Sequence, residues 1–372
     1  MTVLAVDVGT GGLRTALITP EGRVLARASV RYEPARPSPL EAEQDPEEWW
    51  GALARCLSSI GGERLSSVRA VCVSGQAPVV LPVDGEGRPL HPAILWMDRR
   101  AERQAEELSG MGVPADASSA AAKIAWLARE RPDVYSRAEA ILQASDYLAM
   151  RLSGVAATDR FSAMTAGYDP YSGRWPGPLS RLAEKIPRVV EPGTPLGPAS
   201  EEAVSLGIPR EAVVVAGSVD AYLAVLGSGA VEPGSACDVT GTSTCLMATS
   251  SERIADPLGR VFCCPHFLEG LHIVSGVMST TGASLEWLSR VLGRGVGELA
   301  EEASRAPPGA GGLLFLPYLA GERRPNWDPR ARGAFVGLTL GHGRAHLARA
   351  VMEGCAMGLR QVADALGEAG LR

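Results

Sequence analysis

The turn Gly9-Thr10-Gly11-Gly12 has residue types that could bind a phosphate group, because glycine accepts positive φ and leaves backbone amides open to an anion. Arg14 adds a cation, and Asp7 stands where its carboxylate could hold Mg²⁺ through water. The flanking segments, Thr2 to Val8 and Thr15 to Ile18, predict the two strands of a hairpin. A tight turn without a ligand would have the same sequence, so this turn alone leaves both interpretations open.

A second turn of the same kind, Gly241-Thr242-Ser243, strengthens the phosphate interpretation. The segments Ala5 to Thr10 and Ala236 to Thr242 each place an Asp on a strand that runs into a Gly/Thr turn. We interpret this echo as a sign of duplicated domains that face each other across a cleft, with chance similarity as the alternative. Two such turns would form a clamp for a polyphosphate.

Other nucleotide-binding patterns do not fit the chain. A dinucleotide fingerprint requires glycine where Arg14 stands, and its turn leads into a helix instead of a strand. The sequence also has no Walker A lysine and no nucleophile elbow. The phosphate chemistry predicted here therefore belongs to another architecture.

Asp220 could act as a general base. It follows the apolar strand predicted at Ala212 to Ala216 through Gly217-Ser218-Val219, and it begins a predicted helix at Ala221 to Leu226. A carboxylate at the end of a strand could accept a proton from a hydroxyl group that attacks the γ-phosphate of ATP. The alternative is an ordinary helix N-cap.

The segment Trp96-Met97-Asp98-Arg99-Arg100 combines an aromatic face, a carboxylate and a guanidinium fork. That set suits a polyol, whose carbon face stacks on indole while its hydroxyl groups form paired hydrogen bonds. A helix start with Asp98 as cap and solvated arginines explains the same spacing.

The elements that must position these residues alternate along the chain. A third strand at Arg23 to Val30 and a buried strand at Val68 to Val73 predict a sheet with both antiparallel and parallel pairs. The segment from Tyr168 to Pro198 is rich in proline and glycine and predicts loops. We predict helices at 49–60, 99–108, 120–130 and 146–152. The strand and helix pattern then restarts, so the first domain is expected to cover 1–231 and the second 232–372.

Composition bounds the partners. The 372 residues favour two domains at about 150 residues each. A net charge of −6 argues against a broad basic surface for nucleic acid. No apolar stretch reaches the length of a membrane span, and the N-terminus lacks a signal peptide pattern, so we expect a cytoplasmic protein. The seven cysteines form no C-x-x-C pair, and His342 and His346 lack the glutamate of an H-E-x-x-H metal motif.

With these residues in view, the chain resembles the FGGY carbohydrate kinase family from residue 1 to residue 372. The most specific part is Ala334-Phe335-Val336-Gly337-Leu338 followed by His346 to Glu353, which fits the family's C-terminal signature. The segment Lys123-Ile124-Ala125-Trp126-Leu127 fits the other signature, with Ala120 where Ser, Thr or Pro is usual. Gly321-Glu322-Arg323 and Trp327 to Gly333 are similar to a stretch in xylulokinases and glycerol kinases.

The resemblance implies an α/β fold of two ribonuclease-H-like, actin-like ATPase domains, with ATP and Mg²⁺ phosphorylating a sugar hydroxyl. Asp220 would be the general base. The phosphate-binding residues would be Asp7, Thr10, Gly11 and Arg14 in the first loop, Gly241 and Thr242 in the second, and Gly282 beside the nucleotide. The sugar would contact Gln76, Trp96, Asp98, Arg99 and Asp220, and Asp7 would hold Mg²⁺.

Two departures bear on the substrate. Ala77-Pro78 stand where xylulokinases show Met-His, and Ala221 follows the base as in ribulokinases. We therefore expect a ketopentose such as D-xylulose, with ribulose, glycerol or another polyol as alternatives. The sequence leaves open which hydroxyl group is phosphorylated and the oligomeric state, a homodimer included.

The family continues beyond the helix expected at 347–366 with a strand, a glycine-rich adenosine loop and closing helices. This chain ends at Arg372, so we expect a second domain that lacks the adenosine-binding segment. A truncated fragment and a fragment completed by another chain both fit. A non-catalytic member of the same superfamily, which binds sugar or nucleotide, is the rival to a kinase.

Overall fold

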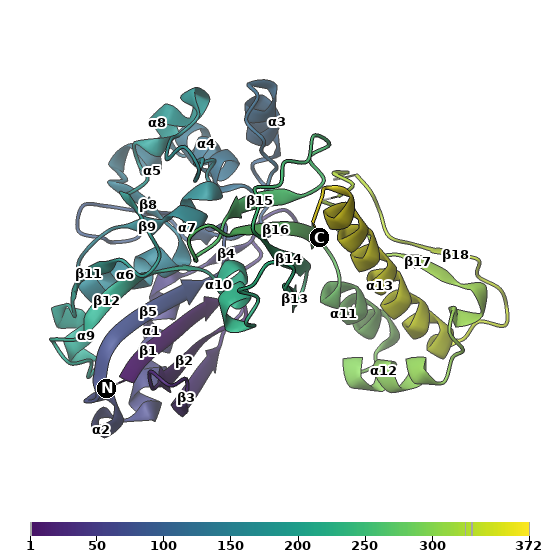
Figure 1. Ribbon diagram of the computed structural model, residues 1–372, viewed down its shortest axis with the longest axis horizontal. Coiled ribbons are helices and arrows are strands. Elements are labelled where there is room, and N and C mark those ends of the chain that lie inside the picture. Colours follow the sequence, from purple (N-terminus) through teal and green to yellow (C-terminus); the bar gives the residue numbers. More distant parts are fainter. Residues whose placement is uncertain (1, 324, 329, 372) are drawn as a thin grey trace. The chain divides into compact units, whose positions relative to one another are not determined.

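The computed structural model describes residues 2–323, 325–328 and 330–371. The chain divides into two compact units, 1–223 and 224–372. Each unit builds a sheet and covers it with helices (Figure 1). The division lies within helix α10 (Asp220–Gly227), eight residues before the boundary expected from the sequence.

The main sheet of the first unit mixes parallel and antiparallel strands, as the sequence predicted. Its order is β11-β12-β5-β1-β2-β3. The strand β5 runs parallel to both β1 and β12, whereas the outer pairs are antiparallel. The carboxyl ends of β1, β5 and β12 therefore meet at one edge. The strands are β1 (Thr2–Gly9), β2 (Gly12–Ile18), β3 (Val24–Arg31), β5 (Val68–Gly75), β11 (Pro195–Pro198) and β12 (Val213–Val219).

Short ribbons and helices complete the first unit. The ribbons pair β4 (Glu43–Gln44) with β7 (Ala93–Ile94), β6 (Leu81–Val83) with β8 (Ala140–Leu142), and β9 (Thr158–Asp159) with β10 (Val189–Val190). The helices are α1 (Pro46–Ile60), α2 (Gly62–Leu65), α3 (Glu102–Gly110), α4 (Ala120–Glu130), α5 (Pro132–Arg137), α6 (Ala144–Ser153), α7 (Arg160–Met164), η1 (Gly177–Leu179), α8 (Ser180–Ala183) and α9 (Glu201–Ser205).

The core of the first unit lies between its sheet and the helices α1 and α6. Helix α1 begins at Asp45, whose side chain accepts from the amide of Glu47, and Pro46 fills the first helical position. One face of α1 is apolar, and Trp49 on that face is completely buried. Its ring meets Tyr147 of α6 at 6.3 Å between centroids. This packing holds α1 against the sheet whose strands β1 and β2 carry the turn at 9–12.

The second unit contains a four-stranded antiparallel sheet in the order β13-β14-β16-β15, and a separate ribbon of β17 and β18. The strands are β13 (Ala236–Thr240), β14 (Thr244–Ser250), β15 (Phe262–Pro265), β16 (His272–Met278), β17 (Leu314–Leu316) and β18 (Ala334–Val336). The helices are α11 (Gly282–Leu292), α12 (Val296–Ser304), η2 (Ala310–Gly312) and α13 (Arg344–Glu368).

The long helix α13 packs on both sheets of the second unit, and two glycines allow its close approach. A Cβ added at Gly354 of α13 would lie 2.2 Å from the carbonyl oxygen of Phe315. A Cβ added at Gly276 of β16 would lie 2.5 Å from the Val362 side chain. These glycines are required by packing, because neither position has positive φ.

Most of the predicted elements are confirmed. Helix α4 has the bounds predicted from the sequence, and the hairpins around Gly11 and Gly241 are present. Helix α3 was expected to begin at Arg99 but begins at Glu102, because Asp98 and Arg100 are held in a buried ion pair before it. The loop-rich segment 168–198 holds only short elements. Among the described residues, no helix is both long and apolar enough to cross a membrane.

Candidate functional site

Three strand ends bring the first group of candidate residues together. In the sheet register, Asp7 of β1 lies opposite Ser74 of β5, and Ser74 lies opposite Ser218 of β12. Asp220 comes two residues after Ser218, at the first position of α10. Parallel strands direct ligands to the crevice at their carboxyl ends. The predicted general base and the predicted phosphate-side carboxylate therefore lie at the same edge of the first unit.

Asp7 is held between two partners. Its Oδ2 accepts from Arg14 Nη1 at 2.9 Å, and its Oδ1 accepts from the Ser74 hydroxyl at 3.2 Å. Arg14 lies on β2 opposite Asp7 in the hairpin register. The Arg14 side chain is 65% exposed, so this ion pair contributes little to stability and can rearrange when an anion binds.

The carboxyl group of Asp220 lies in surroundings that shift its pKa. Burial raises the pKa of its carboxyl group to about 6, and the nearby charge of Asp7 acts in the same direction. The hydrogen bond from the Ala221 amide, at 2.6 Å, and the charge of Arg14 oppose that shift. An N-cap accepts from the amide two or three residues further on, whereas this contact is with the next residue. Asp220 is therefore not an ordinary N-cap, and its role as a general base stays a prediction.

A network of side chains joins three residues that the sequence singled out separately. The Thr10 hydroxyl donates to Gln76 Oε1 at 2.7 Å and accepts from Trp96 Nε1 at 3.0 Å. Gln44 completes the network, because its Nε2 donates to the Thr10 carbonyl and its Oε1 accepts from Gln76 Nε2 and from Trp49. The first turn and the predicted sugar contacts Gln76 and Trp96 therefore belong to one hydrogen-bond network.

Gln44 was missed by the sequence analysis. It is 2% exposed and lies on β4, a strand of two residues among acidic side chains. No periodicity or motif marks such a position. Its role depends on Thr10 and Gln76, which are 34 and 32 residues away in the chain.

Asp98 and Arg99 do not join this network. Asp98 is completely buried, and both of its oxygens accept from the Arg100 side chain at 2.8 to 3.0 Å. Its Oδ2 also accepts from the Ala42 amide at 2.7 Å. The Arg99 guanidinium lies 3.7 Å from the Asp116 carboxylate. The expected contact of Asp98 with sugar therefore gives way to a structural ion pair, because a fully engaged buried carboxylate has no oxygen to offer.

The tip of the first turn is open. Gly11 is exposed, and a Cβ added there would meet nothing within 4 Å. The base of the turn is closed instead: the Tyr32 hydroxyl donates to the Gly9 carbonyl at 2.9 Å. A Cβ added at Gly12 would lie 2.6 Å from the Val30 carbonyl oxygen. Within this turn, the open space therefore lies at Gly11.

The second unit brings its three candidate residues together as well. The amide of Gly282 donates to the Gly241 carbonyl at 3.1 Å, and the amides of Thr281 and Ala283 donate to the Thr242 carbonyl. A Cβ at Gly282 would lie 2.2 Å from the Gly241 carbonyl oxygen. The start of α11 thus holds the turn by its carbonyl groups, so that the exposed Gly241 and Thr242 keep their outer side free.

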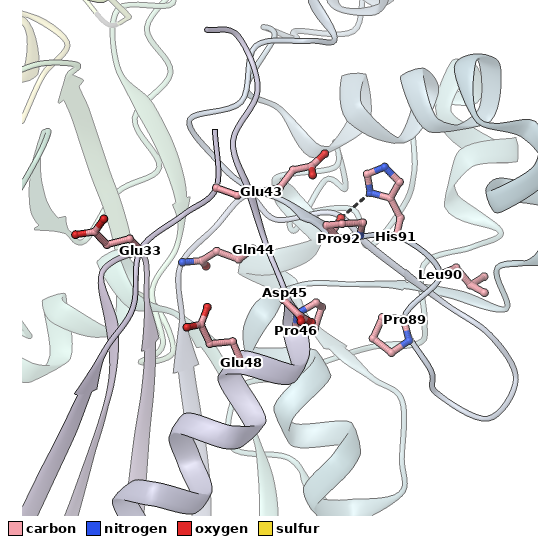
Figure 2. A pocket seen from close by; sticks show the side chains of 11 residues that line it. Glu33, Glu43, Gln44, Asp45, Pro46, Glu48, Pro89, Leu90, His91 and Pro92 are labelled. Carbon is pink, nitrogen blue, oxygen red and sulfur yellow. Dashed lines mark hydrogen bonds between the residues drawn. The ribbon is translucent and has the colours of Figure 1, made fainter. Parts of the chain in front are cut away.

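A pocket of about 560 Å³ lies in the first unit, where Gln44 borders it (Figure 2). Four carboxylates and three prolines are among its eleven lining residues, and His91 Nδ1 contacts the Pro92 carbonyl at 2.7 Å. Such a lining disfavours a phosphate group. The carboxylates are Glu33, Glu43, Asp45 and Glu48.

Metal clusters built from protein side chains alone are absent from the described part of the chain, where no group of three His, Cys, Asp or Glu residues could hold an ion. His342 and His346 lie with their rings 5.3 Å apart, and His342 Nε2 contacts the Gly311 carbonyl.

Comparisons with known proteins agree over the whole chain. The model of the N-terminal domain of the FGGY family of carbohydrate kinases matches residues 2–227, and that of the C-terminal domain matches residues 237–371. Xylulose kinase of Escherichia coli (strain K12) is 30% identical, over 99% of this chain and 79% of the relative. Gluconokinase of Bacillus subtilis (strain 168) is 30% identical, over 98% of this chain and 77% of the relative.

Solved structures give the same result. A "xyloylose kinase" from Brucella ovis matches with a TM-score of 0.89 and 30% identity, over 100% of this chain and 80% of that chain. Xylulose kinase from Rhodospirillum rubrum matches with a TM-score of 0.86 and 30% identity, over 100% and 80%. The fold is the two-domain, actin-like ATPase fold of these enzymes. The chain belongs to the FGGY family of carbohydrate kinases.

Proposed function

We propose that this sugar kinase transfers the γ-phosphoryl group of ATP to a hydroxyl group of a ketopentose, with D-xylulose as the first candidate. The observation that carries the proposal is the position of Asp220, at the carboxyl end of β12, near Asp7 and Arg14, with a pKa of about 6. The xylulose kinases among the relatives support the choice of sugar.

In the proposed reaction, Asp220 accepts the proton of the sugar hydroxyl as its oxygen attacks the γ-phosphorus. The bond from that phosphorus to the bridging oxygen breaks, and ADP leaves with the electron pair. The amides of Thr10 and Gly11 in the first unit, and the amide and hydroxyl of Thr242 in the second, would position the phosphate groups. Gly241 would leave room for their approach, because its own amide donates to the Ser243 carbonyl at 2.9 Å. Gln76 and Trp96, joined through Thr10, would position the sugar.

Asp7 fits the place of a Mg²⁺ ligand. Mg²⁺ keeps several waters and needs only one or two carboxylates besides substrate phosphates. Asp7 is 35% exposed and lies beside Ser74 and Arg14, so a hydrated cation could reach it. The cation would neutralise charge on the transferred group. We also propose that 1–231 carries the sugar site and the base, while 232–372 carries the second phosphate turn.

The test is ADP release with Mg²⁺ and ATP, measured by a coupled assay against D-xylulose, D-ribulose, L-ribulose, glycerol, erythritol and gluconate. Gluconate is included because gluconokinases are among the relatives. We expect turnover with one ketopentose to exceed that with the other compounds. If folded protein released no ADP with any of these compounds, that result would contradict the proposal.

Asp220→Ala separates a kinase from a non-catalytic binder. A kinase loses its turnover, by about a thousandfold or more, because the proton acceptor is gone. It keeps its sugar affinity, which is measured by titration calorimetry. A binding protein would show no sugar-dependent turnover before the substitution either.

A further inference from the structure

Lys123 is a buried cation that the proposed reaction does not use. It lies on α4, one of only two lysines in the chain, and none of its surface is exposed. It also stands in the first turn of its helix, where a positive charge opposes the helix dipole. Neither burial nor the helix dipole therefore favours a lysine here. Its contacts must supply the reason.

The Lys123 ammonium contacts two backbone carbonyl groups from different segments. Its Nζ donates to the Leu95 carbonyl at 2.5 Å and to the Pro78 carbonyl at 3.5 Å. Within the described residues, no carboxylate lies within 4 Å of this ammonium to form an ion pair. Burial accordingly lowers the pKa of Lys123 to about 7, with Asp98 and Asp116 opposing the shift from a distance.

The two carbonyl groups belong to the segments that carry the proposed sugar contacts. Leu95 immediately precedes Trp96, and Pro78 follows Gln76 by two residues. Trp96 and Gln76 then meet at the Thr10 hydroxyl, at 3.0 and 2.7 Å. The two segments are also paired through the backbone, where Val80 and Ile94 exchange two hydrogen bonds of 3.0 Å. The ammonium and the Thr10 hydroxyl therefore add side-chain contacts to this pairing, in the stretch from Gln76 to Val80 on one segment and from Ile94 to Trp96 on the other.

Other groups already hold the neighbouring backbone donors. The Gln76 amide donates to the Val8 carbonyl, and the Val79 amide donates to Gln143 Oε1. Pro78 has no amide hydrogen, so its carbonyl is its only hydrogen-bonding group. The Leu95 carbonyl also accepts from the Asp98 amide at 3.0 Å, whereas among the described residues the Pro78 carbonyl accepts from Lys123 alone.

We propose that Lys123 is a positioning residue for sugar binding, which sets the spacing between Gln76 and Trp96 by holding the Pro78 and Leu95 carbonyl groups together. This inference rests on the proposed kinase function. It assigns no chemical step to Lys123, whose ammonium touches neither reacting group. Its loss should weaken sugar binding and leave ATP binding unchanged.

The test compares Lys123→Met with Lys185→Met. Lys185 makes the same kind of contact, because its Nζ donates to the Ala138 carbonyl at 2.6 Å. That carbonyl lies just before β8, in a segment that carries no proposed site residue. We expect Lys123→Met to raise the sugar KM by about tenfold, the effect of losing one charge-assisted hydrogen bond, with the ATP KM unchanged. Lys185→Met should leave both KM values unchanged. Equal changes in the sugar and ATP KM values of Lys123→Met would overturn the proposal, and so would an unchanged sugar KM.

Hydrogen exchange of the free protein gives a second readout that needs no ligand. Lys123→Met should speed amide exchange in peptides that cover 76–80 and 94–98, and Lys185→Met should not. Unchanged exchange in both peptides would overturn the inference. A wild-type chain with no sugar-dependent ADP release would refute the kinase proposal instead, and exchange would still decide whether Lys123 holds the two segments.

Lys123→Gln keeps the test decisive if the methionine variant does not fold. Glutamine retains a donor of shorter reach, so it can satisfy one carbonyl group but not both. We expect a sugar KM between that of the wild type and the value, about tenfold higher, expected when both contacts are lost, again with an unchanged ATP KM. A wild-type sugar KM in folded Lys123→Gln would overturn the proposal.

Discussion

Asp220 is a carboxylic acid that the fold holds partly out of water, beside a second carboxylate. Burial is the larger cause of its raised pKa, and the charge of Asp7 is a smaller one. A general base must be deprotonated to act, and it works best when its pKa lies near the operating pH. A pKa of about 6 leaves Asp220 mostly ionised at neutral pH while keeping it a better proton acceptor than an exposed aspartate.

This pKa predicts the acidic limb of the pH profile. Because protonated Asp220 cannot accept the sugar proton, kcat/KM for the sugar should fall about tenfold per pH unit below pH 6. Between pH 7 and 8 the ionisation of Asp220 should no longer change kcat/KM. Initial rates from pH 4.5 to 8 measure it, with sugar well below its KM. An acidic limb centred near pH 4 would contradict the assignment of Asp220 as base.

The same pKa predicts a stability cost at neutral pH. The folded pKa is raised above that of an unfolded aspartate, so folding favours the protonated form, and the cost appears as pH rises through about 4 to 6. Asp220→Asn removes the charge and should raise the free energy of unfolding at pH 8 by up to about 3 kcal/mol. At pH 4 the gain should nearly vanish. Urea unfolding at both pH values checks this, and equal effects at pH 4 and 8 would refute it.

At the scale of elements, each strand end is fixed by its neighbours. Ser218, two residues before Asp220, donates to the buried Asp159 at 2.7 Å. This hydrogen bond joins the end of β12 to the start of α7. A Cβ added at Gly217 would lie 1.7 Å from the Val73 carbonyl oxygen, where the register of β12 and β5 shifts. Asp220, the proposed base, therefore follows a short irregular segment whose path is determined by packing as well as by strand pairing.

The contact between Gly282 and Gly241 predicts an effect on nucleotide binding. In Gly282→Ala the new Cβ would overlap the Gly241 carbonyl oxygen, so the second turn and the start of α11 must separate. We expect the ATP KM to rise by about tenfold or more, with the sugar KM much less affected. Steady-state kinetics with each substrate varied in turn measures both values.

Gly297→Ala is the matched control for that substitution. Gly297 lies in helix α12 of the same unit, and a Cβ there would meet nothing within 4 Å. Alanine should be neutral or slightly stabilising at this position, by about 0.5 to 1 kcal/mol. Equal ATP KM values for Gly282→Ala and Gly297→Ala would show that the turn does not depend on this close approach.

At the scale of the whole molecule, each unit has its own apolar core and its own group of candidate residues. The first unit carries Asp7, Thr10, Gln76, Trp96 and Asp220, and the second carries Gly241, Thr242 and Gly282. The proposed reaction therefore needs both units.

One apolar surface of the second unit predicts self-association. Leu314 and Leu316 on β17 and Val336 on β18 share one face of their ribbon and are 48%, 41% and 50% exposed, whereas Phe315 and Phe335 on the other face pack on Trp287. The paired substitution Leu314→Glu with Val336→Lys should lower the mass that light scattering records as protein concentration rises. Leu258→Glu, at an exposed leucine outside this ribbon, should leave that mass unchanged. The same rise in mass for all three proteins would refute the prediction.

The sequence by itself determined what depends on neighbouring residues. The periodicity of 120–130 predicted helix α4 to the residue, and alternation predicted the hairpins around Gly11 and Gly241. The two turns and the family signatures also led to the kinase family, which the comparisons confirm. Such features are local because helix periodicity, strand alternation and turn geometry arise from contacts over a few residues.

Only the tertiary structure decided which of these side chains meet. Asp98 has a side chain that could bind a sugar, but the fold buries it against Arg100 and the Ala42 amide. No local sequence pattern predicts its contact with Ala42, which is 56 residues away. Gln44 joins Thr10 to Gln76, and Lys123 reaches across to Leu95 and Pro78. The physical reason is that burial and hydrogen-bond partners depend on how distant strands and helices pack. Spacing along the chain does not encode that packing.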